Sequence, residues 1–104
     1  MALEPEILIG RQDAESDTFP DIDLTPYRAV EKGVSRRHAK IVFDNDGLSI
    51  EDMGSVNGTF LNGERIVPYK AMTLSSGDVV QLGTLVFQVF FELPKLLEEQ
   101  VSKA

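Results

Sequence analysis

Four side chains suited to binding an anion stand at three separate places in the chain: Arg11, Ser35, Arg36 and Asn57. A guanidinium combines a permanent positive charge with planar donors, and a hydroxyl and an amide add neutral donors. A phosphate monoester near neutral pH carries roughly −1.5 to −2 charges and several strong acceptor oxygens. We therefore predict that these residues recognise a phosphate group on a partner and perform no chemistry on it.

Ser35 and His38 form the nearest approach to a catalytic pair, because a histidine can activate a serine hydroxyl. The sequence shows no third group to orient the histidine, so we expect His38 to be structural. Asp17, Asp21 and Asp23 suggest calcium ligands, but they lack the glycine and the final glutamate of an EF-hand loop. The chain has no cysteine, which excludes disulfides and thiolate metal sites. We expect no catalytic residue, no metal and no cofactor.

The composition describes one small globular domain with an acidic surface. The chain has 104 residues, 42% of them hydrophobic, and a formal net charge of −7. Nucleic acids are bound mainly through lysine and arginine, so this charge disfavours them. The neighbouring Arg36 and Arg37 form a small basic spot that suits a single phosphate. No apolar run is long enough to span a membrane, and we expect a cytoplasmic, intracellular protein with no membrane partner.

Short apolar stretches separated by turns must position these donors. Seven stretches have the composition or alternation of strands: residues 7–9, 40–43, 48–52, 59–61, 65–67, 79–82 and 85–91. Asn62-Gly63 lies between two of them and signals a hairpin, because both positions tolerate positive φ. Strands at this spacing predict an all-β sandwich, in which distant loops meet at one end.

Two segments interrupt the series of strands. Residues 12–33 form a long, acidic connection, and loops of this length are commonly functional. Within it, Thr18 and Thr25 are secondary candidates for phosphorylation sites that fold back onto the binding site. Residues 94–101 are predicted to form a short C-terminal helix with a proline in its first turn. We expect residues 1–104 to be a single domain, with a core over about 7–91 and a helical or linker tail over 92–104.

The order of the motifs resembles the forkhead-associated (FHA) domain over roughly residues 7–91. The motifs are Gly10-Arg11, Ser35-x-x-His38, Ser55-x-Asn57-Gly58-Thr59, Asn62-Gly63 and Gly77-Asp78. The resemblance implies a two-sheet β-sandwich of about ten to eleven short strands, with fewer at the N-terminal edge of this chain. It also implies a module that recognises phosphothreonine in partner proteins, downstream of a Ser/Thr kinase.

The resemblance assigns a role to each matching position. Arg11 and Ser35 correspond to the residues that bind phosphate, Arg36 to a variable residue that helps to bind the ligand, and Asn57 to the asparagine that holds the peptide backbone. The remaining candidates are two minor ligand contacts and four residues that shape the loops: Arg37 and Val56, then Gly10, His38, Ser55 and Gly58.

Two positions depart from the family pattern. Some members have a threonine or serine at the position of Val56, where it adds a hydrogen bond to phosphate, and some carry a basic residue at the position of Gly33. The valine predicts a lower affinity for phosphate. The alternative function is an interaction or structural domain that binds an unphosphorylated protein, which the retained Arg11, Ser35 and Asn57 disfavour.

Overall fold

The computed structural model describes residues 5–44 and 47–92. Within these residues the elements follow one another as strands, apart from one turn of 3₁₀ helix. In chain order they are β1 (Glu6–Gly10), β2 (Ile22–Asp23), η1 (Thr25–Tyr27), β3 (Arg37–Asp44), β4 (Gly47–Asp52), β5 (Thr59–Leu61), β6 (Glu64–Arg65), β7 (Met72–Leu74), β8 (Val79–Leu82) and β9 (Leu85–Gln88).

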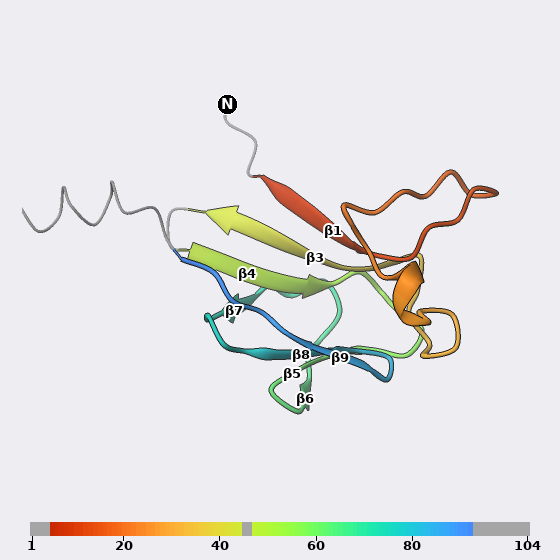
Figure 1. Ribbon diagram of the computed structural model, residues 1–104. Helices are drawn as coiled ribbons and strands as arrows, with labels where there is room; N and C mark the ends of the chain where they lie inside the picture. Colours follow the sequence, from red (N-terminus) through yellow and green to blue (C-terminus); the bar gives the residue numbers. More distant parts are fainter. Residues whose placement is uncertain (1–4, 45–46, 93–104) are drawn as a thin grey trace, which may run out of the picture.

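Two sheets face each other and enclose the core (Figure 1). The first sheet has the order β2-β1-β3-β4-β7, and the second has the order β6-β5-β8-β9. Alternation along β4 buries Leu48, Ile50 and Asp52 on its inner face, as expected for a strand with one face toward a core. The largest apolar side chains that are completely buried come from both sheets: Ile9, Ile50, Val80 and Leu82.

The predicted all-β sandwich of two sheets is confirmed, and so is the hairpin between β5 and β6. Asn62 and Gly63 in its turn have φ angles of 50° and 88°. The described residues form nine strands, with β1 the first, in line with the smaller number expected at the N-terminal edge. The sequence did not reveal β2 and β7, because two or three residues are too few to show alternation. The helix expected over 94–101 lies outside the described residues.

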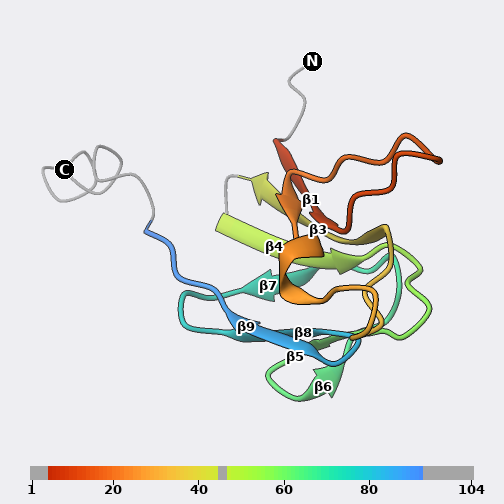
Figure 2. The same cartoon turned by 45° about the vertical axis from the view of Figure 1, so that its right-hand side comes forward.

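Three connections lie at the same end of the sandwich, as both Figure 1 and Figure 2 show. They are residues 11–21 between β1 and β2, residues 28–36 before β3, and residues 53–58 between β4 and β5. We call them the first, second and third loop. Together they carry all four of the predicted phosphate and peptide ligands, so the fold brings distant parts of the sequence to one end as expected.

Candidate functional site

The second loop lies between the other two and is bonded to both. On the side of the first loop, Arg11 Nε donates to the Val34 carbonyl at 2.8 Å, and the Arg11 backbone N–H donates to the Arg36 carbonyl at 3.2 Å. Gly10 permits this close approach, because a Cβ at this position would lie 1.9 Å from the Arg36 carbonyl oxygen. The backbone and the Nε of Arg11 are therefore anchored to the second loop.

On its other side, the second loop is bonded to the third. The Val56 N–H donates to Ser35 Oγ at 3.2 Å, and Asn57 Nδ2 donates to the Gly33 carbonyl at 2.9 Å. Gly33 has a φ of 80°, and a Cβ there would lie 2.6 Å from Asn57 Nδ2, so a larger residue would displace this amide. An amide has two N–H groups and a carbonyl. Since the bond to Gly33 uses one N–H, Asn57 retains the capacity to hold a peptide backbone.

His38 is completely buried beneath these two loops and joins them. Its Nδ1 accepts the Ser35 backbone N–H at 2.9 Å, so Nδ1 carries no proton, and Nε2 donates to the Gly58 carbonyl at 2.9 Å. Burial lowers the pKa of His38, against the opposing effects of the Gly58 carbonyl and Asp52, which agrees with a neutral ring. The imidazole contacts the backbone of Ser35, while the hydroxyl of Ser35 contacts Val56. This is the geometry of a brace between loops rather than of a base beside a nucleophile.

Asp52, which was not among the predicted site residues, organises the third loop. It is 1% exposed, and its carboxylate accepts four hydrogen bonds. Oδ1 accepts the hydroxyls of Ser55 and Thr59, both at 2.6 Å, and Oδ2 accepts the backbone N–H groups of Gly54 and Ser55 at 3.0 and 3.1 Å. Burial acts to raise the pKa of Asp52, but these bonds outweigh it, and the pKa lies below its usual value.

Ser55 and Gly58 complete the turn that Asp52 begins. Ser55 Oγ accepts the Gly58 N–H at 3.0 Å while it donates to Asp52. Gly58 has a φ of 89°, and its carbonyl is the oxygen that His38 contacts. A signal for Asp52 was present in the sequence, since it continues the inward-facing alternation of residues 48–52. A carboxylate on the buried face of a strand needs hydrogen-bond donors around it.

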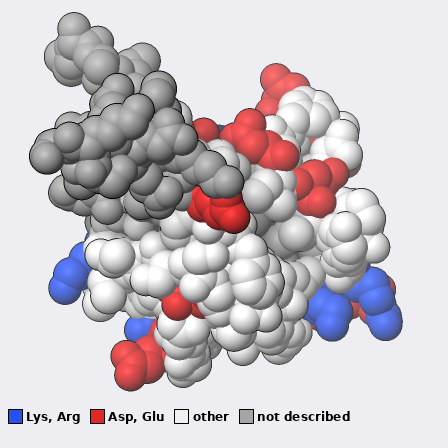
Figure 3. Space-filling view, turned by 60° about the vertical axis from the view of Figure 1, so that its left-hand side comes forward, with Lys and Arg blue, Asp and Glu red and all other residues white. Residues whose placement is uncertain are grey.

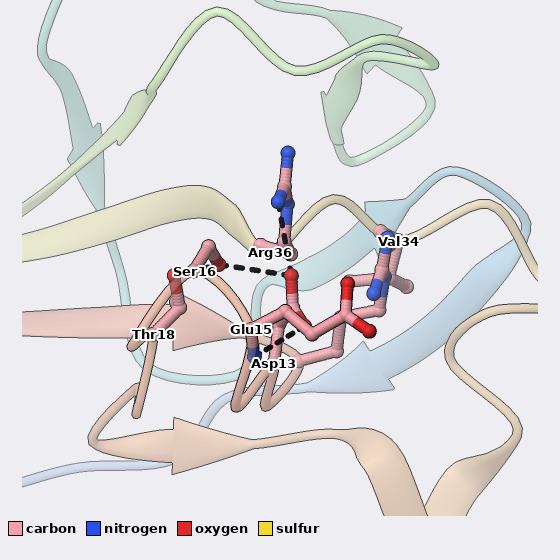
Figure 4. Close-up of polar contacts among 7 residues, drawn as sticks. Asp13, Glu15, Ser16, Thr18, Val34 and Arg36 are labelled. Atoms are coloured by element: carbon pink, nitrogen blue, oxygen red, sulfur yellow. Dashed lines mark hydrogen bonds and ion pairs between the residues drawn. The ribbon is translucent and has the colours of Figure 1, made fainter.

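Arg36 is paired with an acidic residue of the first loop. Its Nη1 donates to Asp13 Oδ2 at 2.9 Å, and Ser16 Oγ donates to the same oxygen at 2.9 Å (Figure 4). The bond from Arg36, and after it the bond from Ser16, lowers the pKa of Asp13. Ser16 Oγ also lies 2.9 Å from Thr18 Oγ1. The first loop thus brings a carboxylate and two hydroxyls to the edge of the site, and none of the three was among the predicted ligand-binding residues.

A hollow of about 450 Å³ opens between these loops. Its wall includes two of the four main predicted ligands, both minor candidates and two hydroxyl residues of the first loop: Ser35, Arg36, Arg37, Val56, Ser16 and Thr18. The other two main candidates, Arg11 and Asn57, are bonded to the neighbouring residues 33–34. The Val56 side chain is 83% exposed here and offers no donor. With guanidinium groups and hydroxyls along its wall, the hollow suits an anionic ligand.

A larger hollow of about 840 Å³ is lined mostly by apolar side chains from residues 22–32 and 85–90, with Arg28 and Lys32 of the second loop also at its wall. We place the candidate site at the smaller hollow, because the chemistry of its lining matches an anion.

On the face drawn in Figure 3, acidic side chains gather at the upper right, and Lys and Arg lie at the lower left and lower right. Among residues 5–44 and 47–92, no group of His, Cys, Asp or Glu is arranged to hold a metal ion. No helix in the described part of the chain is long and apolar enough to cross a membrane.

Comparison with known proteins gives the family of the chain and the same fold. The family profile of the FHA domain matches residues 7–83. The probable E3 ubiquitin-protein ligase dma1 of Schizosaccharomyces pombe is 42% identical over 81 residues, which cover 74% of this chain and 29% of dma1. The glycogen accumulation regulator GarA of Mycobacterium tuberculosis is 36% identical over 100 residues, covering 96% of this chain and 54% of GarA. The chain therefore spans between about a third and a half of these curated relatives.

Solved structures resemble the domain as a whole. One, from a structural and functional analysis of phosphothreonine-dependent FHA domain interactions, is 29% identical with a TM-score of 0.66. The superposition covers 89% of this chain and 83% of that chain. The similarity in structure thus extends over most of both chains.

Proposed function

Because this chain belongs to the FHA domain family, we propose that it binds partner proteins through a phosphorylated threonine and mediates interactions that depend on a Ser/Thr kinase. FHA domains bind phosphothreonine peptides. The observation that supports the same activity here is that Arg11 and Asn57 are bonded to residues 33–34 of the second loop, directly beside Ser35 and Arg36. Three separate parts of the sequence meet there, and each supplies a group of the kind that phosphate or a peptide backbone requires.

We assign the phosphate to the guanidinium of Arg11, the hydroxyl of Ser35 and the guanidinium of Arg36. An arginine presents a planar fork of donors and is charged at every physiological pH, which makes it the strongest anchor for phosphate. Asn57 holds the backbone of the peptide beside the phosphothreonine. Arg37 and Val56 are minor contacts at the wall of the hollow, and His38, Ser55 and Gly58 hold the loops in place.

The same proposal covers the location and extent of the activity. The FHA domain is a binding module, and we infer that this chain carries out no catalysis of its own. Because Ser/Thr kinases and their substrates meet inside the cell, we place the domain in the cytoplasm. We treat residues 1–104 as one domain with a tail over 92–104, and the identity of the partner as a property of the whole protein to which the domain belongs.

A titration with three matched peptides tests the function. One carries phosphothreonine, the second carries glutamate in its place, and the third carries unmodified threonine, all within a degenerate flanking sequence. A carboxylate is planar and has one charge, so it cannot replace a tetrahedral phosphate with roughly −1.5 to −2 charges. We expect the phosphopeptide to bind at least about tenfold more tightly than either of the others, a difference of about 1.4 kcal/mol or more. Equal binding of all three would instead favour the alternative function, an interaction or structural domain that binds an unphosphorylated protein.

The variant Arg11→Ala tests whether Arg11 binds the phosphate. We expect it to weaken the phosphopeptide by at least about tenfold, because it removes a charge-assisted fork. It also removes the Nε bond to Val34, so the free energy of unfolding should fall by about 0.5–1.5 kcal/mol. Arg28→Ala is the matched control, since Arg28 is an exposed arginine at the start of the second loop that pairs with Glu31 and does not line the smaller hollow. Unchanged phosphopeptide affinity in Arg11→Ala would remove Arg11 from the site.

A further inference from the structure

Asp13 holds two of the groups that surround the candidate phosphate site. Its Oδ2 accepts one hydrogen bond from Arg36 Nη1 and one from Ser16 Oγ, each at 2.9 Å (Figure 4). Its Oδ1 accepts the Glu15 backbone N–H at 3.2 Å. The backbone groups of Asp13 and Thr18 are bonded to each other in both directions, at 3.0 and 2.9 Å, which closes the turn. The carboxylate therefore has a fixed position within a closed turn.

The donors that Asp13 holds are of the kind that a phosphate would take. Arg36 and Ser16 both line the hollow of about 450 Å³, and because they share one oxygen, Arg36 Nη1 and Ser16 Oγ lie within about 6 Å of each other. An ionised carboxylate has the same requirement for donors as a phosphate oxygen. In the free domain, the carboxylate of Asp13 thus occupies hydrogen-bond donors at the wall of the site proposed for phosphate.

We propose that Asp13 competes with the bound phosphate for Arg36 and for the hydroxyl of Ser16, and that it thereby sets the affinity of the site. The inference rests on the proposed function. Two effects act in the same direction. Phosphate can form a full set of bonds to Arg36 and Ser16 only by displacing or sharing bonds made to Asp13, and the charge of Asp13 repels the phosphate dianion at short range. Ser16 becomes a further hydrogen-bond donor to the phosphate. It lies in the first loop, where the FHA motifs assign only Arg11 to phosphate binding.

The variant Asp13→Asn tests this directly, because it keeps the size of the side chain and an acceptor oxygen while removing the charge. We expect it to bind the phosphothreonine peptide at least about threefold more tightly than the parent at low ionic strength, where charge repulsion is least screened. Glu15→Gln is the matched control, because it removes one negative charge from the same turn, two residues from Asp13. The bond to Arg36 is made by Asp13 and is therefore retained in this control. Glu15→Gln should leave the affinity unchanged within about 1.5-fold, since an exposed charge without this contact is screened. Asp13→Ser, which also lacks the charge, guards against an effect peculiar to asparagine, and thermal unfolding shows whether each variant is folded.

A double-variant cycle with Arg36→Ala decides whether the competition acts through Arg36. We expect most of the gain from Asp13→Asn to disappear in the Arg36→Ala background, because the contested guanidinium is then absent. If Asp13→Asn and Asp13→Ser bind with the parent's affinity or more weakly, Asp13 positions Arg36 or is irrelevant, and the inference fails while the proposed function stands. A gain that persists in full without Arg36, or that Glu15→Gln reproduces, overturns it in favour of a general charge effect. If neither the parent nor the Asp13 variants bind phosphothreonine peptides, the function and the inference fail together; binding by the Asp13 variants alone supports both.

Discussion

Replacing Asp52 by asparagine should destabilise the whole domain, because its buried carboxylate accepts bonds from four separate donors. Two are hydroxyls, at 2.6 Å, and two are backbone N–H groups of the third loop, at 3.0 and 3.1 Å. Asparagine keeps one acceptor oxygen and replaces the other with an NH₂ group, so either the two backbone N–H groups face a donor or the two hydroxyls must rotate and lose their acceptor. Hydrogen bonds to a charged group contribute about 1.5–3 kcal/mol each, and losing two of them should cost about 3–6 kcal/mol.

A loss of this size is large against the total stability of a small domain, which is about 5–15 kcal/mol. Each kcal/mol corresponds to about 4–8 °C in Tm for a domain near this size, so Asp52→Asn should lower Tm by at least about 12 °C. Urea and thermal unfolding, followed by circular dichroism, measure both quantities. Glu51→Gln is the control, because it removes a charge one residue away on the outer face of β4, where Glu51 lies 4.0 Å from Lys40. It should cost less than about 1 kcal/mol.

The pH dependence gives a second measure of the same carboxylate. The pKa of Asp52 is lowered in the folded domain, so its contribution to stability is present above the ordinary aspartate pKa near 3.8 and is lost as the pH falls through the folded value. Asp52→Asn should remove this part of the acid transition. A variant within about 1 kcal/mol of the parent in stability would refute the reasoning, since it would show that the loop finds other partners for its donors.

Two further predictions concern His38 and Val56. Burial lowers the pKa of His38, so the domain should lose stability as the pH falls below about 6.5. His38→Gln should flatten this dependence of Tm on pH. A parent Tm that is constant between pH 7 and 5 would contradict a neutral His38 that braces the loops. Val56→Thr should strengthen phosphopeptide binding by about 2- to 12-fold in calorimetry, through a new hydroxyl at an exposed position on the wall of the hollow, with Tm unchanged. Weaker binding across a peptide panel would show that valine packs against the ligand.

The sequence was sufficient for the two-sheet β-sandwich and most of its strands, and for the FHA family; the roles of the residues that the FHA motifs mark stay predictions. Strand alternation and the Asn62-Gly63 turn depend on local chemistry, which a sequence displays directly. The contacts of Asp13 and Asp52 depend on tertiary structure and were not predicted. Asp13 meets Arg36 across 23 positions of sequence, and in the acidic stretch from 12 to 33 nothing local distinguishes it from its neighbours. Asp52 was within reach, because the inward alternation of β4 placed it on the buried face.

Substitutions around residues 33–36 fall into two groups. Some should change both the stability of the domain and its affinity for phosphopeptide, and others should change the affinity alone. Asp52 and His38 are buried and hold the backbone that carries Asn57 and Ser35, so substitutions there should change Tm and phosphopeptide affinity together. Asp13 and Val56 lie at the rim, where Asp13 takes donors from the site and Val56 supplies none, so substitutions there should change affinity while the fold keeps its stability. Evolution of affinity in this domain is therefore expected to act at the rim of the hollow. The braces beneath it are constrained, because any loss there is also a loss of the folded state.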